Sequence, residues 1–198
     1  MCNIAQSLNV ISPLLTHPTD PSLPLLKQTT FYPYLLFSRY MRGRALAVHL
    51  RCGEYEGSMH AAFAPDASDY GWMRGAVDTP WLDVSATISF GTEEQAEEED
   101  GDADGQGDGK GDRKGKERYV CLAVTNVHEH KDFEVEMAVE GIQGKEVQVF
   151  KVGGEGLGPW TTNTWEKREE VGIRESVWKG EGKYVFERCS LTLLRWRV

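Results

Sequence analysis

Two glutamates in the stretch RCGEYEG are spaced so that they could act together in acid–base chemistry. Glu54 and Glu56 are two residues apart, and on a β-strand such residues project from the same face. Paired carboxylates cleave glycosidic bonds when they flank the sugar. Two acids on one strand with a glycine at each flank are more often an exposed edge, so we predict no catalytic role for this pair.

Two histidines in the stretch VHEHKD are spaced so that they could share a metal ion. His128 and His130 would lie on one face of a strand. The sequence shows no third ligand at a suitable spacing. We therefore predict that both histidines face solvent, that the chain has no metal site, and that it needs no cofactor, since phosphate-loop and dinucleotide-binding motifs are also absent from the sequence.

A strongly acidic stretch interrupts the chain between two predicted strands. Residues 93–118 contain 11 acidic and 5 basic residues, a net charge of −6, whereas the whole chain carries −9. The insertion, residues 92–118, has no apolar side chain larger than alanine and cannot offset the entropy cost of ordering, so we predict a disordered hairpin loop. Asp100, Asp102 and Asp104 resemble the start of a calcium-binding loop, but Gly111 stands where the closing glutamate is required.

Six tryptophans provide aromatic faces on which sugar rings could stack. Trp160 and Trp165 flank the stretch TTNT in a predicted loop and are the best candidates. Trp196 alternates with Leu194 on the predicted last strand, so we expect it in the core. The tryptophans favour an alternative function, in which the chain is a stand-alone β-sandwich that binds carbohydrate or another partner without catalysis.

The first fifteen residues, MCNIAQSLNVISPLL, have helical periodicity. Their apolar side chains form one stripe at helical spacing, namely Met1, Ile4, Leu8, Ile11 and Leu15. The stripe predicts a helix over residues 1–15 that needs a partner surface. Asn3, Gln6 and Asn9 repeat every three residues on another face, and a carboxamide can both donate to and accept from a sugar hydroxyl. From spacing alone, Gln6 is predicted to be a surface residue.

The rest of the chain is predicted to be mainly β. A short apolar helix is expected over 34–41, with Pro33 in its first turn. Short strands separated by glycine-containing turns follow, at 44–52, 81–90, 118–127, 132–141, 145–152, 172–179, 183–186 and 190–198. The stretch 118–127 is apolar on both faces and predicts a central strand, whereas 132–141 alternates and predicts one dry face. Many short strands without intervening helices predict an antiparallel sandwich or barrel.

Composition excludes several classes of protein. No basic face accompanies the net charge of −9, which argues against nucleic acid as a partner. No apolar run is long enough to cross a membrane. The four cysteines are widely scattered without a C-x-x-C pair, so neither a zinc site nor a disulfide framework is indicated, and Cys121 is expected to be a buried thiol.

Five stretches, in this order, resemble one known family: NIAQSLNVISPLL, KQTTFYPYLLFSRYMRG, AVHLRCGEYEG, DTPWLDVSATIS and KYVFERCSLTLLRW. Together they are similar to the C-terminal part of glycoside hydrolase family 51, the α-L-arabinofuranosidases, in its fungal type. The resemblance covers most of the chain except the acidic insertion.

The resemblance implies a fold. Family members have a (β/α)8 barrel that carries the active site and a β-sandwich packed against it. Residues 1–43 then resemble the end of the barrel and a linker, with two helices left over, and residues 44–198 resemble a jelly-roll-like β-sandwich that contains the insertion. Both helices are expected to expose apolar surface when the barrel is missing.

The resemblance also implies a function. Family members release terminal arabinofuranose from arabinan or arabinoxylan by a retaining mechanism with two glutamates, which lie upstream of the NIAQ motif; nothing in this chain matches them. By position Gln6 is the glutamine that hydrogen-bonds arabinose in the family. The chain is thus expected to contribute no catalytic residue, to be inactive alone, to need the missing catalytic barrel as a partner, and to be extracellular as many members are.

Overall fold

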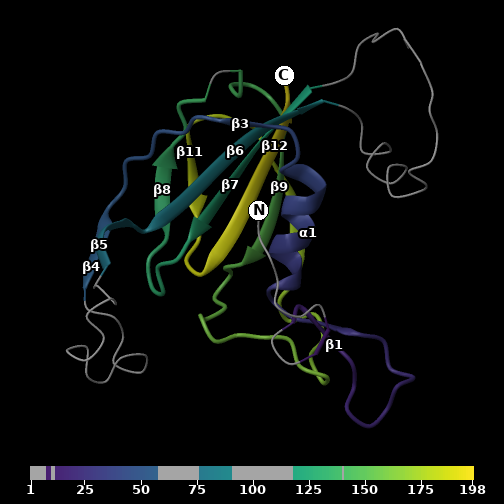
Figure 1. Cartoon of the computed structure of the whole chain (residues 1–198). Coiled ribbons are helices and arrows are strands. Elements are labelled where there is room, and N and C mark those ends of the chain that lie inside the picture. The colour runs from purple at the N-terminus through teal and green to yellow at the C-terminus, as the bar shows by residue number, and fades with distance from the viewer. Residues whose placement is uncertain (1–7, 10–11, 58–75, 91–117, 140) are drawn as a thin grey trace, which may run out of the picture.

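The computed structural model describes residues 8–9, 12–57, 76–90, 118–139 and 141–198. These residues form a predominantly antiparallel β structure (Figure 1). The predicted acidic insertion and its calcium-like aspartates lie outside the described residues, apart from Arg118 at its end. Within the described residues, no helix is both long enough and apolar enough to span a bilayer.

A six-stranded antiparallel sheet forms the centre of the molecule. Its strand order is β10-β9-β12-β7-β6-β3. The strands are β3 (Arg44–Leu46), β6 (Leu82–Phe90), β7 (Arg118–Asn126), β9 (Val147–Gly153), β10 (Ile173–Trp178) and β12 (Ser190–Arg197). The predicted sandwich-type fold is therefore confirmed. Five of the six strands fall within the predicted stretches, and β9 ends one residue beyond its stretch, at Gly153.

The strand β7 confirms the prediction of a central strand. It pairs with β12 on one side and with β6 on the other, so that Cys121 lies between Arg195 and Thr87. The Cys121 side chain is fully buried, and burial raises the pKa of its thiol to about 11. A neutral, inert thiol at this position fits the apolar pattern from which the strand was predicted.

Two further strands form a layer over one face of the large sheet. β8 (Phe133–Glu136) pairs with β11 (Lys183–Phe186). Phe133 and Val135 of β8 pack against the core, whereas Glu134 and Glu136 are exposed. This confirms the predicted dry face of the stretch, although the strand ends at Glu136 rather than at Gly141.

A helix packs on the other face of the large sheet. α1 (Phe31–Tyr40) begins three residues before the predicted Tyr34, and it places Tyr32 and Leu36 against Phe150 and Leu193. Leu36 is only 1% exposed. The expectation that this helix leaves its apolar surface uncovered is therefore wrong for the buried side of the helix, and it holds only for its outer side, where Tyr34 and Phe37 are exposed.

The helix predicted over residues 1–15 is not found at the described positions. Leu14–Leu15 form a short strand, β1, which pairs with β2 (Leu26–Lys27). Asn9 has a φ of 60°, and its side-chain oxygen accepts a hydrogen bond from the backbone N–H of Thr16 at 2.8 Å. A left-handed residue and Pro13, which has no N–H to donate, end helical geometry despite the apolar spacing.

The stretch predicted as a strand over 44–52 is a strand only to Leu46. Gly43, just before the strand, has a φ of 115°, and a side chain there would collide with the Ile88 carbonyl oxygen. From Ala47 the chain leaves the sheet and lines a cavity (described below) before β4 (Glu54–Gly57), which pairs with β5 (Ala76–Pro80). The small sheets β1-β2 and β4-β5 were not predicted as pairs.

Candidate functional site

The predicted sugar-binding residue, Gln6, lies outside the described residues, as do Asn3 and Cys2. Beyond it, Leu8, Asn9 and an N-terminal segment that starts at Ser12 are described.

A buried asparagine holds the β9–β10 loop against this N-terminal segment. Asn163 is 3% exposed, and its amide nitrogen donates hydrogen bonds to the Lys27 carbonyl at 2.9 Å and to the Val171 carbonyl at 2.8 Å. The same nitrogen is 3.3 Å from the Tyr32 hydroxyl, and the Asn163 side-chain oxygen accepts from the Val171 N–H at 2.8 Å. One side chain thus joins the loop to β2 and α1.

Arg168 and Trp165 form a second connection between the same two segments. A guanidinium nitrogen of Arg168 donates to the carbonyls of Pro24 and Leu25, at 2.6 Å and 3.1 Å. The guanidinium also lies 5.7 Å from the centre of the Trp165 ring, and His17 meets that ring edge-on at 4.7 Å. Trp165, predicted as a sugar platform, is therefore half-buried in contacts within the chain.

Trp160, the other predicted platform, is 86% exposed. Trp196 is 1% exposed in the core, as predicted. The structure thus separates the two loop tryptophans: Trp165 anchors the loop, whereas the indole of Trp160 is open to solvent.

The histidines predicted to face solvent differ from each other. His130 is exposed, but His128 is half-buried, and its ring lies 4.3 Å from that of Trp81. The Nδ1 atom of His128 accepts hydrogen bonds from the backbone N–H groups of His130 and Lys131. That nitrogen is engaged within the chain, and no group of three or more metal-binding side chains occurs among the described residues.

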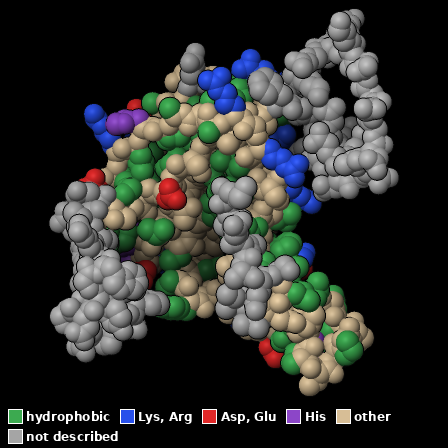
Figure 2. Space-filling view, in the orientation of Figure 1, with side chains coloured by type: hydrophobic (Ala, Val, Ile, Leu, Met, Phe, Trp, Pro, Cys, Tyr) green, Lys and Arg blue, Asp and Glu red, His purple; other side chains and the backbone are tan. Residues whose placement is uncertain are grey.

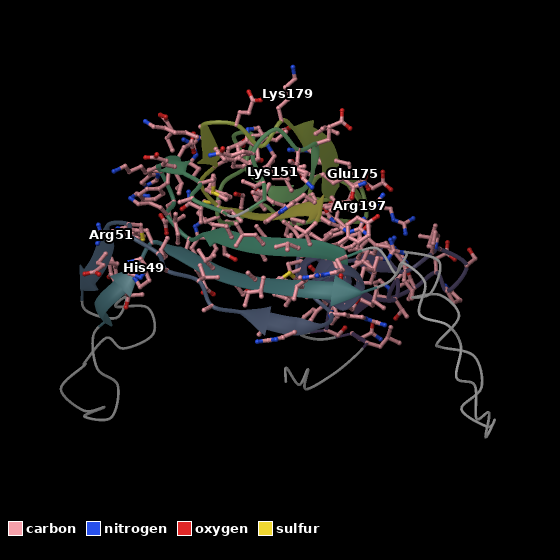
Figure 3. All side chains as sticks on the ribbon, turned by 90° about the horizontal axis from the view of Figure 1, so that it is seen from above. His49, Arg51, Lys151, Glu175, Lys179 and Arg197 are labelled. Atoms are coloured by element: carbon pink, nitrogen blue, oxygen red, sulfur yellow. The ribbon has the colours of Figure 1, made fainter. Side chains whose placement is uncertain are left out.

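Acidic side chains near β9 are held by cations rather than poised for acid–base catalysis. Lys151 lies between Glu155, at 3.3 Å, and Glu187, and Arg174 contacts Glu155 at 2.6 Å. Burial alone would raise the pKa of Glu187, but hydrogen bonds from Lys151 and from the Glu155 N–H lower it below its usual value. Figure 3 shows Lys151 on the β9–β10 side of the sheet, away from His49.

The absence of a catalytic role for the Glu54 and Glu56 pair stays a prediction. Glu54 lies exposed on β4, whose pairing with β5 is irregular between Tyr55 and Gly57. The side chain of Glu56 lies outside the described part of the chain.

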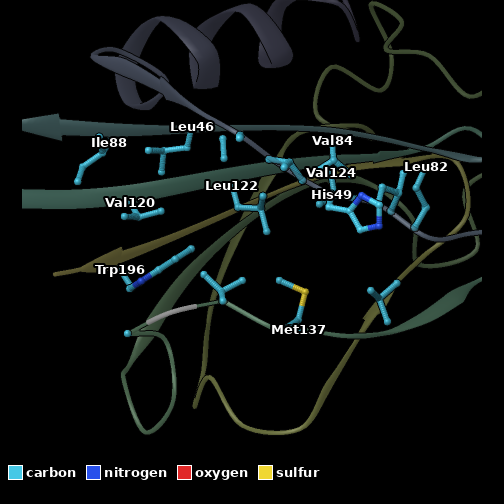
Figure 4. Close-up of a pocket in the computed structure, with 18 of the residues that line it drawn as sticks. Leu46, His49, Leu82, Val84, Ile88, Val120, Leu122, Val124, Met137 and Trp196 are labelled. Atoms are coloured by element: carbon cyan, nitrogen blue, oxygen red, sulfur yellow. The ribbon is translucent and has the colours of Figure 1, made fainter.

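A cavity of about 880 Å³ separates the large sheet from the β8–β11 layer (Figure 4). Its walls are mostly apolar and include Leu122 and Trp196 from the large sheet and Met137 from the opposite side. Apolar side chains also gather on the face seen in Figure 2. Among the described lining residues, Glu136 is the one side chain that carries a carboxyl group.

Comparison with known proteins identifies a family. The model of the alpha-L-arabinofuranosidase C-terminal domain matches residues 1–190. The probable alpha-L-arabinofuranosidase C of Aspergillus terreus is 44% identical over 198 residues, and alpha-L-arabinofuranosidase C of Emericella nidulans is 40% identical over the same length. Each match covers 100% of this chain and 30% of the relative, so the chain spans less than a third of these proteins.

Solved structures show the same fold. The thermostable family 51 alpha-L-arabinofuranosidase from Thermotoga petrophila superposes with a TM-score of 0.65 at 20% identity, covering 96% of this chain and 32% of that one. The alpha-L-arabinofuranosidase from Thermotoga maritima, solved as an arabinose complex, gives a TM-score of 0.65 at 19% identity, with 98% and 33% covered. With the family match over nearly the whole length, these findings confirm the resemblance: the chain belongs to the alpha-L-arabinofuranosidase C-terminal domain family.

Proposed function

We propose that this chain is the C-terminal, non-catalytic part of an enzyme that removes terminal α-L-arabinofuranosyl residues from arabinan or arabinoxylan. The family match over residues 1–190 carries the proposal. The relatives that this chain matches at 30% of their length are named alpha-L-arabinofuranosidases. The proposed mechanism is retaining and uses two glutamates that the remainder of such a protein supplies.

The contribution of this chain would then be to support that catalytic barrel and to add Gln6 to the edge of its pocket. Gln6 is proposed to hydrogen-bond the arabinose hydroxyls, because a carboxamide offers both a donor and an acceptor. The β9–β10 loop holds Lys27 and Pro24, farther along the N-terminal segment, through Asn163 and Arg168.

Inactivity of the isolated chain is part of the proposal. It is supported by the described carboxylates: Glu155 and Glu187 are paired with cations, and Glu136 stands alone in the cavity lining. Retaining hydrolysis needs two carboxyl groups about 5 Å apart. We further propose an extracellular location, because the polysaccharide substrate lies outside the cell.

The test is an assay with an aryl α-L-arabinofuranoside in two arms. The purified chain is expected to give no turnover above background, whereas a chimera that carries this chain in place of the matching part of the Aspergillus terreus relative is expected to be active. Gln6→Ala in the chimera should lower kcat/KM at least tenfold through the lost hydrogen bond. Turnover by the chain alone, or an inactive chimera beside an active parent, would contradict the proposal.

A further inference from the structure

Trp160 is unusual among the described tryptophans. Its side chain is 86% exposed, whereas Trp196 is 1% exposed and Trp81, Trp165 and Trp178 are each partly buried. An indole presents a large apolar surface, and leaving it in water forgoes most of the stabilisation it could provide. A fully presented indole on a surface loop is available to a binding partner.

The loop holds this indole on a fixed backbone. The Thr161 N–H donates to the Gly158 carbonyl at 3.1 Å, and the Gly158 N–H donates to the Thr161 hydroxyl at 3.1 Å. Pro159 stands just before Trp160 and has a restricted φ, as is common in tight turns. Because the turn is closed by two hydrogen bonds, little backbone entropy is lost when a ligand binds the ring.

The same loop is fixed to the segment that follows Gln6. Asn163 donates to the Lys27 carbonyl, Arg168 to the Pro24 carbonyl, and the Thr162 hydroxyl lies 3.3 Å from the Gln28 side-chain oxygen. Trp160 and the N-terminal segment thus belong to one hydrogen-bonded unit.

The residues of the loop that carries Trp160 favour a carbohydrate over a protein partner. Along the β9–β10 loop, residues 154–172, Trp160 is the one exposed large apolar side chain; Leu23 and Leu25 are exposed on the N-terminal segment to which the loop is bonded. Protein-binding anchors are set in contiguous apolar patches, which this loop does not provide. A sugar ring instead presents C–H groups to one aromatic face and hydroxyls to polar groups, and Thr162 and Thr164 are exposed on the same loop.

We propose that Trp160 is a sugar-stacking contact for an arabinose-containing polysaccharide, at a position along the polymer other than the residue that is cleaved. The inference rests on the proposed function for the identity of the polymer. It assigns Trp160 a role in polymer affinity and none in bond cleavage.

The experiment is native gel electrophoresis of the chain through gels that contain soluble arabinoxylan, arabinan or dextran. Arabinoxylan or arabinan is expected to slow the chain, and dextran is not. Trp160→Ala should weaken the apparent affinity roughly tenfold, and Trp160→Phe should retain part of it, because a smaller aromatic face remains. The matched control is Val177→Ala, which removes another exposed apolar side chain, on β10, and should migrate as the wild type does.

The proposal is overturned if the wild-type chain migrates unhindered in both arabinose-containing gels. It is also overturned if Trp160→Ala is slowed as much as the wild type, and this second result would assign the Trp160 ring to a protein contact instead. Near-ultraviolet circular dichroism checks that the variants are folded. The aryl arabinofuranoside assay of the chimera is independent, since that small substrate carries no polymer: Trp160→Ala should leave it unchanged, and its failure would count against the proposed function and not against this binding site.

Discussion

The two faces of the six-stranded sheet are covered in different ways. On one face, α1 places Tyr32 and Leu36 on Phe150, Val152 and Leu193, and these side chains are all buried. On the other face, the β8–β11 pair leaves a cavity of about 880 Å³. Alternate residues of the same strands serve the two faces: in β12, Leu193 points to the helix, and Leu194 belongs to the opposite cluster.

The difference is explained by where the large side chains of the two layers meet. A single helix and a pair of strands about 4.8 Å apart are both narrower than a six-stranded sheet, so width alone does not separate the two faces. On the helix face, α1 is centred on β9 and β12, where the large side chains are, and its Tyr40 ring stacks on Phe150 at 4.6 Å. A face is closed where large side chains of one layer pack directly on large side chains of the other. Apolar character of both layers is not enough.

The largest expected effect is on the closed face. Leu36→Ala should destabilise the chain by about 2–5 kcal/mol, because the removed side chain is 1% exposed and leaves a cavity in a packed cluster. The free energy of unfolding in urea measures it. The matched control, Phe37→Ala, truncates the neighbouring side chain, which is 39% exposed, and should cost less than about 1 kcal/mol. Equal losses from the two variants would show that α1 does not pack as described.

A smaller effect compares the two faces directly through their buried alanines. Ala123, 2% exposed, lies in the helix-face cluster, and Ala86, 8% exposed, lines the cavity. Ala123→Leu should destabilise by about 1–3 kcal/mol through overpacking, whereas Ala86→Leu has space to enter and should be neutral or slightly stabilising. Thermal melts of both variants give the comparison. If Ala86→Leu were the more damaging of the two, the cavity would not be available to a side chain.

The smallest effect concerns the ion pair that joins β9 to the end of β11 on the open face. Because the pKa of Glu187 is lowered in the folded state, its contribution is present above the unfolded value near 4.5 and is lost as the pH falls through the folded value. The Glu187 side chain is partly exposed, at 27%, so solvent screening limits the contribution to about 1 kcal/mol. Unfolding free energies from pH 7 to pH 3 should fall less for Glu187→Gln than for the wild type. An identical acid dependence would mean that the pair does not stabilise the layer.

Several strands were predictable because their residue patterns are local. The stretch 118–127 is apolar on both faces because β7 is flanked by strands and covered on both sides, and β8 alternates because one of its faces is wet. The prediction failed where a local exception overrides spacing. Asn9 and Pro13 interrupt an apolar stripe that would otherwise suit a helix, and the chain leaves the sheet after Leu46 although its pattern continues.

The candidate site was predictable in part. Spacing marked Trp160 and Trp165 as a pair, but it could not distinguish them, because the His17 and Arg168 contacts that hold Trp165 come from distant parts of the chain. Asn163 was missed as the residue that joins the loop to β2. A polar residue within TTNT, between two tryptophans, carries no local sign that it is buried at 3% exposure.

The sequence by itself determined the β character of the chain, its central strand, its buried Cys121 and its family, because strand periodicity and ordered motifs are properties of adjacent residues. Only the tertiary structure decided which face is closed, where the cavity lies and which tryptophan remains exposed. Those features depend on the relative positions of layers formed by residues far apart in the chain, and no local pattern records them.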